Sequence, residues 1–265
     1  MVAPSSIRHP KELWTLVFTL AVAVTVIALF TPFTFGALLL LVLLGVGMNF
    51  LAVVRRVGAV RRGATRIERL PDVAQIVSSC RQRLDVTDEI EVYVTSSPVL
   101  NAYAVGFAPP YVVVLHSALL EELDRVELAY VVGHELAHVK YKHTTVLGLI
   151  GQLGTQSYGV PILSLLLRAV FLSWMRVTER TADRAGLIAC GRLDKALSTQ
   201  LKLSVGHERA RRVDVGALIR HYREHDVELA QQLGDVLSTH PRMEARIDAM
   251  VDFAITNARP GFLEI

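Results

Sequence analysis

Two histidines four residues apart, with a glutamate directly after the first, occur in the stretch VVGHELAHVKYKH, residues 131–143. On an α-helix such a pair shares one face, so His134 and His138 can direct their imidazoles at a single ion. Glu135 projects beside them, where it can reach a metal-bound water without being a ligand. This pattern is typical of zinc peptidases, in which the metal activates water and the glutamate acts as general base.

The alternative is a surface helix that happens to carry two histidines. The surrounding residues favour a metal site, because most are apolar and predict a helix buried on much of its circumference. Burying histidine and glutamate together costs several kcal/mol unless they have partners, and a metal ion supplies one. The apolar neighbours are Val131, Val132, Leu136, Ala137 and Val139.

A catalytic zinc takes three protein ligands, so a third ligand must come from another element. Glu179 in the segment ERTAD is the best candidate, because Asp183 lies four residues on and shares its helix face. Glu179 can bind the metal while Asp183 accepts the far N–H of a ligand histidine. Taken alone, ERTAD is more typical of a solvated, salt-bridged face, and its significance comes from following HELAH.

A second pair, HYREH at His221 to His225, matches the inverted H-x-x-E-H zinc motif. Its neighbourhood, IRHYREHDVE, is charged on all sides, as expected of a solvated helix. The inverted motif also needs a carboxylate ligand well downstream, where few residues remain. We interpret this pair as a coincidence.

The elements that must position these residues follow from hydrophobic period and turn residues. A helical pattern over 64–84 precedes three strand patterns, at 90–94, 101–107 and 111–115. Asp124 and Glu127 then form a capping-box pattern that begins the HELAH helix, and Lys140, Lys142 and His143 gather in its last turn. A small sheet is therefore expected before a long helix, and a later helix carrying ERTAD is expected to end at Gly191.

Two apolar runs occupy the N-terminal part of the chain. Residues 13–30 and 35–54 carry no charge, and each approaches the roughly 20 apolar residues that cross a bilayer core. Pro32 lies in the short turn between them, so the pair predicts a transmembrane hairpin. A cleaved signal peptide is the alternative for the first run, but it does not explain the second.

The flanking charges predict the orientation of this hairpin. Arg8 and Lys11 precede the first run, four arginines follow the second, and the turn carries no charge. Both ends, and the rest of the chain, are therefore expected in the cytoplasm. We predict a membrane anchor over 1–63 and a catalytic domain over 64–265. The four arginines are Arg55, Arg56, Arg61 and Arg62.

A third apolar segment, residues 145–174, is interrupted by glycines, glutamines, Pro161 and Arg168. Neither half is long enough for a comfortable span. We favour helices that are buried or lie at the membrane surface, and keep two further transmembrane helices as the alternative. In both cases the chain returns to the same side of the membrane.

The composition agrees with a membrane protein and argues against a nucleic-acid-binding protein. Hydrophobic residues make up 52% of the chain. The net charge of +3, without a long basic block interleaved with aromatics, argues against nucleic acid as a partner. Two cysteines in no metal-type spacing suit a reducing compartment. We assign to packing or surface the residues Cys80, Cys190, His9, His116, His143 and His207.

From about residue 70 to the C-terminus, the chain resembles a family of membrane metalloproteases that includes the heat-shock protease HtpX, the CAAX prenyl proteases and the mitochondrial OMA-type enzymes. The resemblance rests on an ordered set of segments rather than on HELAH alone. In chain order they are LNAYAVG (100–106), LHSALLEEL (115–123), VELAYVVGHELAHV (126–139), ERTADRAG (179–186) and STHPRMEARI (238–247). The region that carries additional membrane spans in HtpX is short and broken here.

The resemblance implies one zinc ion per chain, bound by His134, His138 and Glu179. It implies that Glu135 is the catalytic base and that Asp183 supports a ligand histidine from behind.

Three further roles come from the resemblance and not from spacing. Asn101 would help to hold the substrate near its edge strand. His240 and Arg246 would lie near the zinc and bind substrate or stabilise the oxyanion, or His240 would block the open zinc position. From the residues alone, His240 and Pro241 are more typical of a turn that begins a helix.

The fold class that follows is α/β of the α+β kind, mainly helical. We expect a zincin-like, gluzincin-type domain (HEXXH…EXXXD) behind the transmembrane hairpin. The predicted function is that of a zinc metalloendopeptidase in the bacterial plasma membrane, with its catalytic domain on the cytoplasmic side. Its substrates would be proteins or peptides, membrane proteins above all, in quality control or processing.

Two other functions stay open at this point. One is a non-catalytic membrane scaffold that keeps zinc for folding. The other is a prenyl-peptide processing protease, which would need a larger membrane chamber than two spans can build.

Overall fold

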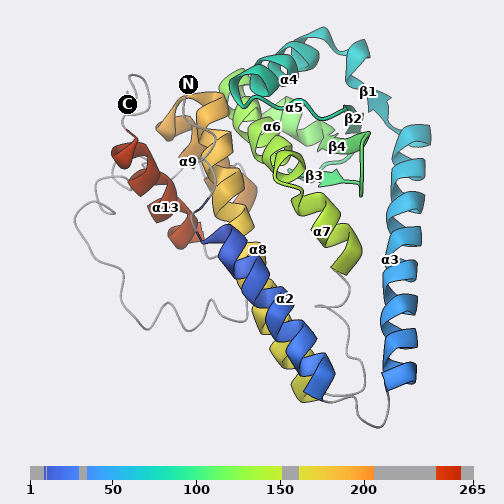
Figure 1. The fold of residues 1–265 in the computed structure, drawn as a ribbon. Helices are drawn as coiled ribbons and strands as arrows, with labels where there is room; N and C mark the ends of the chain where they lie inside the picture. The colour runs from blue at the N-terminus through green and yellow to red at the C-terminus, as the bar shows by residue number, and fades with distance from the viewer. Residues whose placement is uncertain (1–8, 10, 30–34, 151–160, 206–242, 258–265) are drawn as a thin grey trace.

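The computed structural model describes residue 9 and residues 11–29, 35–150, 161–205 and 243–257. These residues form a mainly helical protein with one small sheet, as the sequence predicts (Figure 1). In chain order the elements are α2 (Glu12–Leu29), α3 (Phe35–Gly63), β1 (Thr65–Arg66), the 3-10 turn η1 (Ile67–Arg69), α4 (Pro71–Arg83), β2 (Ile90–Thr95), β3 (Ala102–Val105), β4 (Tyr111–His116), α5 (Ser117–Glu122), α6 (Arg125–Lys140), α7 (His143–Ile150), α8 (Pro161–Cys190), α9 (Leu193–Val205) and α13 (Met243–Thr256).

The sheet has the strand order β1-β2-β4-β3, which leaves β3 at one edge. β2 and β4 run parallel, whereas β1 pairs with β2 and β3 pairs with β4 in antiparallel fashion. Successive side chains of a strand point to opposite faces of the sheet, and β4 buries its side chains on both faces. Val113 and Leu115 join the main core, while Val112 and Val114 pack beneath α3.

The long helices α6 and α8 form the centre of the domain and cross closely. Two glycines allow this approach, Gly133 on α6 and Gly186 on α8. A methyl group at Gly133 would lie 2.4 Å from the Cβ of Ala189, and one at Gly186 would lie 2.8 Å from the Tyr130 backbone carbonyl. The helix backbones are thus nearly in contact, which brings their polar side chains within reach of each other.

The HELAH helix begins as the sequence predicts. The Asp124 side chain accepts hydrogen bonds from the backbone N–H groups of Val126 and Glu127, and the Glu127 carboxylate accepts one from the Asp124 N–H. Lys202 of α9 forms an ion pair with Glu127 at 2.7 Å, so this buried carboxylate is compensated. The start of α6 is therefore held both locally and by a neighbouring helix.

Two helices are long and apolar enough to cross a membrane, α2 over its whole length and α3 over Leu43–Gly63. Only 11% and 6% of their respective windows are buried within the protein. α2 lies along the first half of α8, whereas α3 runs down the other side of the molecule beside α7 (Figure 1). Asn49 of α3 donates a hydrogen bond to the Leu147 carbonyl of α7 at 3.4 Å.

Two predicted boundaries ahead of the sheet are wrong. The second apolar helix continues to Gly63 instead of ending at residue 54, because Val53, Val57 and Val60 pack against the sheet. The helix expected over 64–84 begins only at Pro71, after β1 and η1. A proline disfavours helical conformation in the preceding residue and suits a first helical position, which explains the late start.

Candidate active site

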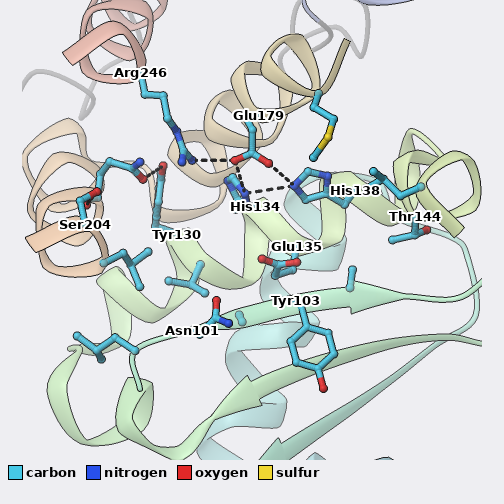
Figure 2. Close-up of a pocket in the computed structure, with 18 residues that line it drawn as sticks. Asn101, Tyr103, Tyr130, His134, Glu135, His138, Thr144, Glu179, Ser204 and Arg246 are labelled. Carbon is cyan, nitrogen blue, oxygen red and sulfur yellow. Dashed lines mark hydrogen bonds and ion pairs between the residues drawn. The ribbon is translucent and has the colours of Figure 1, made fainter. Parts of the chain in front are cut away.

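Three side chains converge between α6 and α8 (Figure 2). The Nε2 atoms of His134 and His138, one turn apart on α6, lie 3.2 Å from each other. Glu179 reaches them from α8: its Oε2 lies 3.7 Å from Nε2 of His134 and its Oε1 lies 3.7 Å from Nε2 of His138. One ligand atom from each residue is within 4.8 Å of the other two, so a single metal ion can bind all three.

The donor set fits the metal that the motif predicts. Two imidazole nitrogens and one carboxylate oxygen are the ligands of many catalytic zinc sites, which keep a further position for water. The side chains of these three residues are only 11–13% exposed. Two imidazole nitrogens and a carboxylate oxygen that face one another at this depth can together bind a divalent cation.

A buried carboxylate lies behind His134. Asp183 Oδ1 is 3.2 Å from Nδ1 of His134, a buried atom that has no aligned hydrogen bond within the described residues. Asp183 also accepts hydrogen bonds from the Tyr130 hydroxyl at 2.8 Å and from Nε and Nη2 of Arg246 at 2.8 and 2.5 Å. Burial opposes ionisation, but the Arg246 guanidinium holds the pKa of Asp183 below its ordinary value. Asp183 is thus a fixed anion that can orient His134.

Arg246 connects a third helix, α13, to the site. Besides its bonds to Asp183, its Nη2 lies 3.4 Å from Oε2 of Glu179. Its side chain is 12% exposed, so its charge acts where screening by water is weak. The planar guanidinium therefore holds two buried carboxylates at a set separation.

Glu135 lies on the side of α6 that faces the sheet, between the histidines and β3 (Figure 2). Burial raises the pKa of its carboxyl to about 7, with Glu179 adding to this and His134 opposing it. A carboxyl group with a pKa near neutrality can both accept and return a proton. Its position and chemistry suit a general base.

A cavity of about 500 Å³ opens at these residues. Its floor carries His134, Glu135, His138 and Glu179, and one wall is formed by residues 100–104, which lead into and include most of β3. Much of the remaining lining is apolar: Val131, Leu147, Met175 and Leu203. The cavity can accept a peptide-sized ligand against the edge strand β3.

The structure brings together most of the site residues predicted from sequence. Asn101 lines the cavity at the start of β3, and Arg246 lines the opposite side (Figure 2). His240, as well as the HYREH pair at 221–225, lies outside the described residues. The roles of all these residues stay predictions.

One residue near the site was missed. The sequence assigned His143 to packing or surface at the end of the HELAH helix. In the structure α6 ends at Lys140, Lys142 adopts a positive φ of 62°, and His143 begins α7 with its side chain fully buried. Its Nδ1 lies 3.1 Å from Nδ1 of His138 and its Nε2 lies 2.9 Å from Oε1 of Glu12. The five-residue spacing from His138 was the one available indication in the sequence.

Comparisons with known proteins agree with this geometry. Residues 68–254 match the model of Peptidase family M48. Over 151 residues the chain is 34% identical to the Plastoglobule-localized metallopeptidase 48, chloroplastic, of Arabidopsis thaliana, which covers 54% of this chain and 44% of that protein. Over 180 residues it is 31% identical to the Protease HtpX homolog of Tropheryma whipplei, with coverage of 65% and 59%.

The chain thus spans about half the length of these curated relatives. The matched range includes both helices that carry the converging side chains, as well as strands β2, β3 and β4 and helix α9. Sequence and geometry therefore lead to one family: the chain belongs to Peptidase family M48.

Proposed function

We propose that this protein is a membrane-anchored, zinc-dependent endopeptidase that cleaves peptide bonds near the membrane surface. One observation carries the proposal: His134, His138 and Glu179 converge on a single point in a cavity that also contains Glu135. Membership of a peptidase family supports the same reaction.

The reaction follows from the residues around that point. A zinc ion held by His134, His138 and Glu179 would polarise the scissile carbonyl and acidify a bound water. Glu135 would take the proton from that water and pass it to the leaving amine. Asp183 and Arg246 keep His134 and Glu179 oriented. Arg246 also lines the cavity, where its charge would stabilise a developing oxyanion.

The edge strand β3 supports a mode of substrate binding. The His116 N–H donates to the Asn101 carbonyl across the antiparallel pair of β3 and β4. In an antiparallel pair, every second residue forms backbone hydrogen bonds to the neighbouring strand, and the residues between point their backbone groups away from it. Because Asn101 bonds to β4, Ala102 and Ala104 direct their N–H and C=O groups towards the free edge of the sheet. An extended peptide can add to this edge as a further strand, with Asn101 at one end.

A proline at Ala102 tests this binding mode, because it removes one outward N–H and leaves the bonds to β4 intact. We expect Ala102→Pro to raise KM for casein at least tenfold, whereas Ala102→Val keeps the N–H and serves as the control. Unchanged cleavage by Ala102→Pro would contradict strand addition.

The anchor and the orientation are also proposals. Residues 1–63 would hold the chain in the bilayer through α2 and α3, with the catalytic domain formed by residues 64–265 on the cytoplasmic side. The arginines at the end of α3 support this, since they suit the cytoplasmic side of a membrane. The course of α8 beside α2 now favours entry of part of 145–174 into the lipid over a purely surface position (Figure 1). Because the anchor would hold the active site close to the bilayer, we expect membrane proteins to be its main substrates.

The deciding experiment combines metal analysis with casein cleavage. The purified full chain in detergent should contain about one zinc and lose activity with a chelator. Glu135→Gln should keep the zinc and lower kcat by a factor of about 10²–10⁴, because only the general base is removed. Glu121→Gln changes an exposed glutamate away from the cavity and should leave both unchanged. Zinc without cleavage in the unaltered protein would instead indicate a scaffold.

A further inference from the structure

A buried carboxylate at the start of the first apolar helix contacts α8 and the first residue of α7, next to the metal site. Glu12 on α2 is 1% exposed, and the structure places it between α6–α7 and α8. Its Oε1 lies 2.9 Å from Nε2 of His143, and its Oε2 accepts a hydrogen bond from the Thr181 hydroxyl. Thr181 lies two residues after Glu179, so Glu12 contacts the neighbourhood of a predicted ligand. Its two partners, His143 and Thr181, lie 131 and 169 residues further along the chain.

The path from Glu12 to the metal site is continuous. His143 uses Nε2 towards Glu12, and its Nδ1 lies 3.1 Å from Nδ1 of His138. The other nitrogen of His138, Nε2, is the one that points at His134 and Glu179. Two imidazoles and a carboxylate thus form a line from the membrane helix to the metal position, all of it buried.

The direction of every hydrogen bond in this line follows from metal binding. A histidine that binds a metal through Nε2 carries its proton on Nδ1. His138 must then donate from Nδ1, so Nδ1 of His143 must accept. His143 consequently carries its own proton on Nε2 and donates it to Glu12, which as a carboxylate accepts. A single arrangement of protons satisfies all of these buried groups.

We propose that Glu12 and His143 are positioning residues for the metal site: Glu12 sets the tautomer of His143, which holds His138 in the orientation and tautomer that bind zinc. His134 has its own carboxylate, Asp183, on the matching nitrogen. The two ligand histidines are thus supported in parallel, one from α8 and one from the membrane helix α2. The N-terminal helix is part of the active site's structure as well as an anchor.

The burial of the Glu12 carboxylate supports a specific role for this residue. A charged residue at the end of an apolar helix is more stable in water than in the protein interior unless it is paired. Glu12 is instead buried with a histidine and a threonine hydroxyl as partners. The predicted hairpin needs no such carboxylate to cross a bilayer, so its burial against the metal helices calls for another reason.

This inference rests on the metal site proposed above, and it is tested by zinc affinity rather than by activity. The full chain in detergent is titrated with zinc against a chelator of known affinity. His143→Leu and Glu12→Ala should each weaken zinc binding about 10- to 100-fold, as loss of such outer partners does elsewhere. Glu12→Gln keeps an acceptor oxygen and the side-chain volume, and should give a smaller loss.

A double-mutant cycle distinguishes a relay from general destabilisation. If Glu12 acts through His143, the double variant Glu12→Ala/His143→Leu binds zinc no more weakly than His143→Leu alone. Losses that multiply in the double variant would overturn the proposal. Cobalt(II) in place of zinc adds a spectroscopic readout, since its visible bands should shift in the single variants.

Two matched controls exclude effects of packing alone. Thr19→Val alters a buried residue of α2 whose hydroxyl donates to its own helix, at the Thr15 carbonyl. Glu127→Gln removes a buried charge from α6 far from the histidines. Both should retain the zinc affinity and cobalt spectrum of the unaltered protein. Failure of the unaltered protein to bind zinc would overturn the proposed function as well, whereas unchanged affinity in both His143→Leu and Glu12→Ala would overturn the relay alone.

Discussion

Replacing Gly133 by alanine tests whether the contact between α6 and α8 sets the geometry of the metal site. Gly133 directly precedes His134. A methyl group there would lie 2.4 Å from the Cβ of Ala189 and 3.1 Å from both the Ala185 carbonyl oxygen and the Gly186 Cα. None of these atoms can move by a change of rotamer, so the two helices must separate.

The size of the effect follows from these distances. Carbon atoms in contact lie about 3.5–4.0 Å apart, so the helices must shift by about 1 Å. Overpacking at a rigid contact costs about 3 kcal/mol, and alanine gains about 1 kcal/mol over glycine in a helix. The free energy of unfolding should therefore fall by about 2 kcal/mol. Metal-ligand distances tolerate about 0.2 Å, so the zinc affinity should fall at least tenfold.

Both effects can be measured on the full chain in detergent. Denaturant unfolding of the metal-free protein gives the stability, and zinc competition with a chelator gives the affinity. Gly63→Ala is the control, because a methyl group at this exposed end of α3 would have no atom within 4 Å. We expect that variant to be as stable as the unaltered protein or slightly more so.

A Gly133→Ala protein with unaltered stability and zinc affinity would refute this prediction. Such a result would mean that the separation of His134 and Glu179 does not depend on this contact. Reduced stability with unchanged zinc affinity would mean that the strain does not reach the metal ligands. It would contradict only the predicted loss of zinc affinity.

The remaining predictions concern charge, capping and pH. Arg246→Ala leaves the buried Asp183 carboxylate without its cation, so stability should fall by about 3–5 kcal/mol in denaturant unfolding, and Arg246→Lys should recover only part of that loss. Asp124→Ala removes the capping box of α6 and should cost about 1 kcal/mol in the same measurement. Burial raises the thiol pKa of Cys80 and of Cys190 to about 12, so neither should react with iodoacetamide at pH 8 until the protein is unfolded; rapid labelling of the native protein would contradict this burial.

Local patterns predicted much of the fold correctly. The strands predicted at 90–94, 101–107 and 111–115 were confirmed, with bounds that differ by two residues at most. Short β-branched runs between turn residues strongly favour a strand over a helix. The capping box at Asp124 was confirmed because it involves residues three apart. Such features depend on neighbours in the chain, which is why the sequence displays them.

Errors occurred where distant contacts decide the structure. The end of α3 could not be placed from hydropathy, since Val57 and Val60 lie among arginines and are ordered by the sheet beneath them. The burial of His143 was missed for the same reason, because its partner Glu12 precedes it by 131 residues.

The sequence by itself determined the pair of histidines on one helix face, the glutamate between them and the apolar character of the N-terminal helices. Helical period and residue chemistry are sufficient for these, because each involves only a turn or two of chain. Only the tertiary structure decided that Glu179 meets the pair, that Arg246 spans two carboxylates, and that Glu12 reaches the site from another helix. These contacts depend on how closely α6, α8, α2 and α13 pack, and packing between helices is a property of matched surfaces that no local pattern encodes.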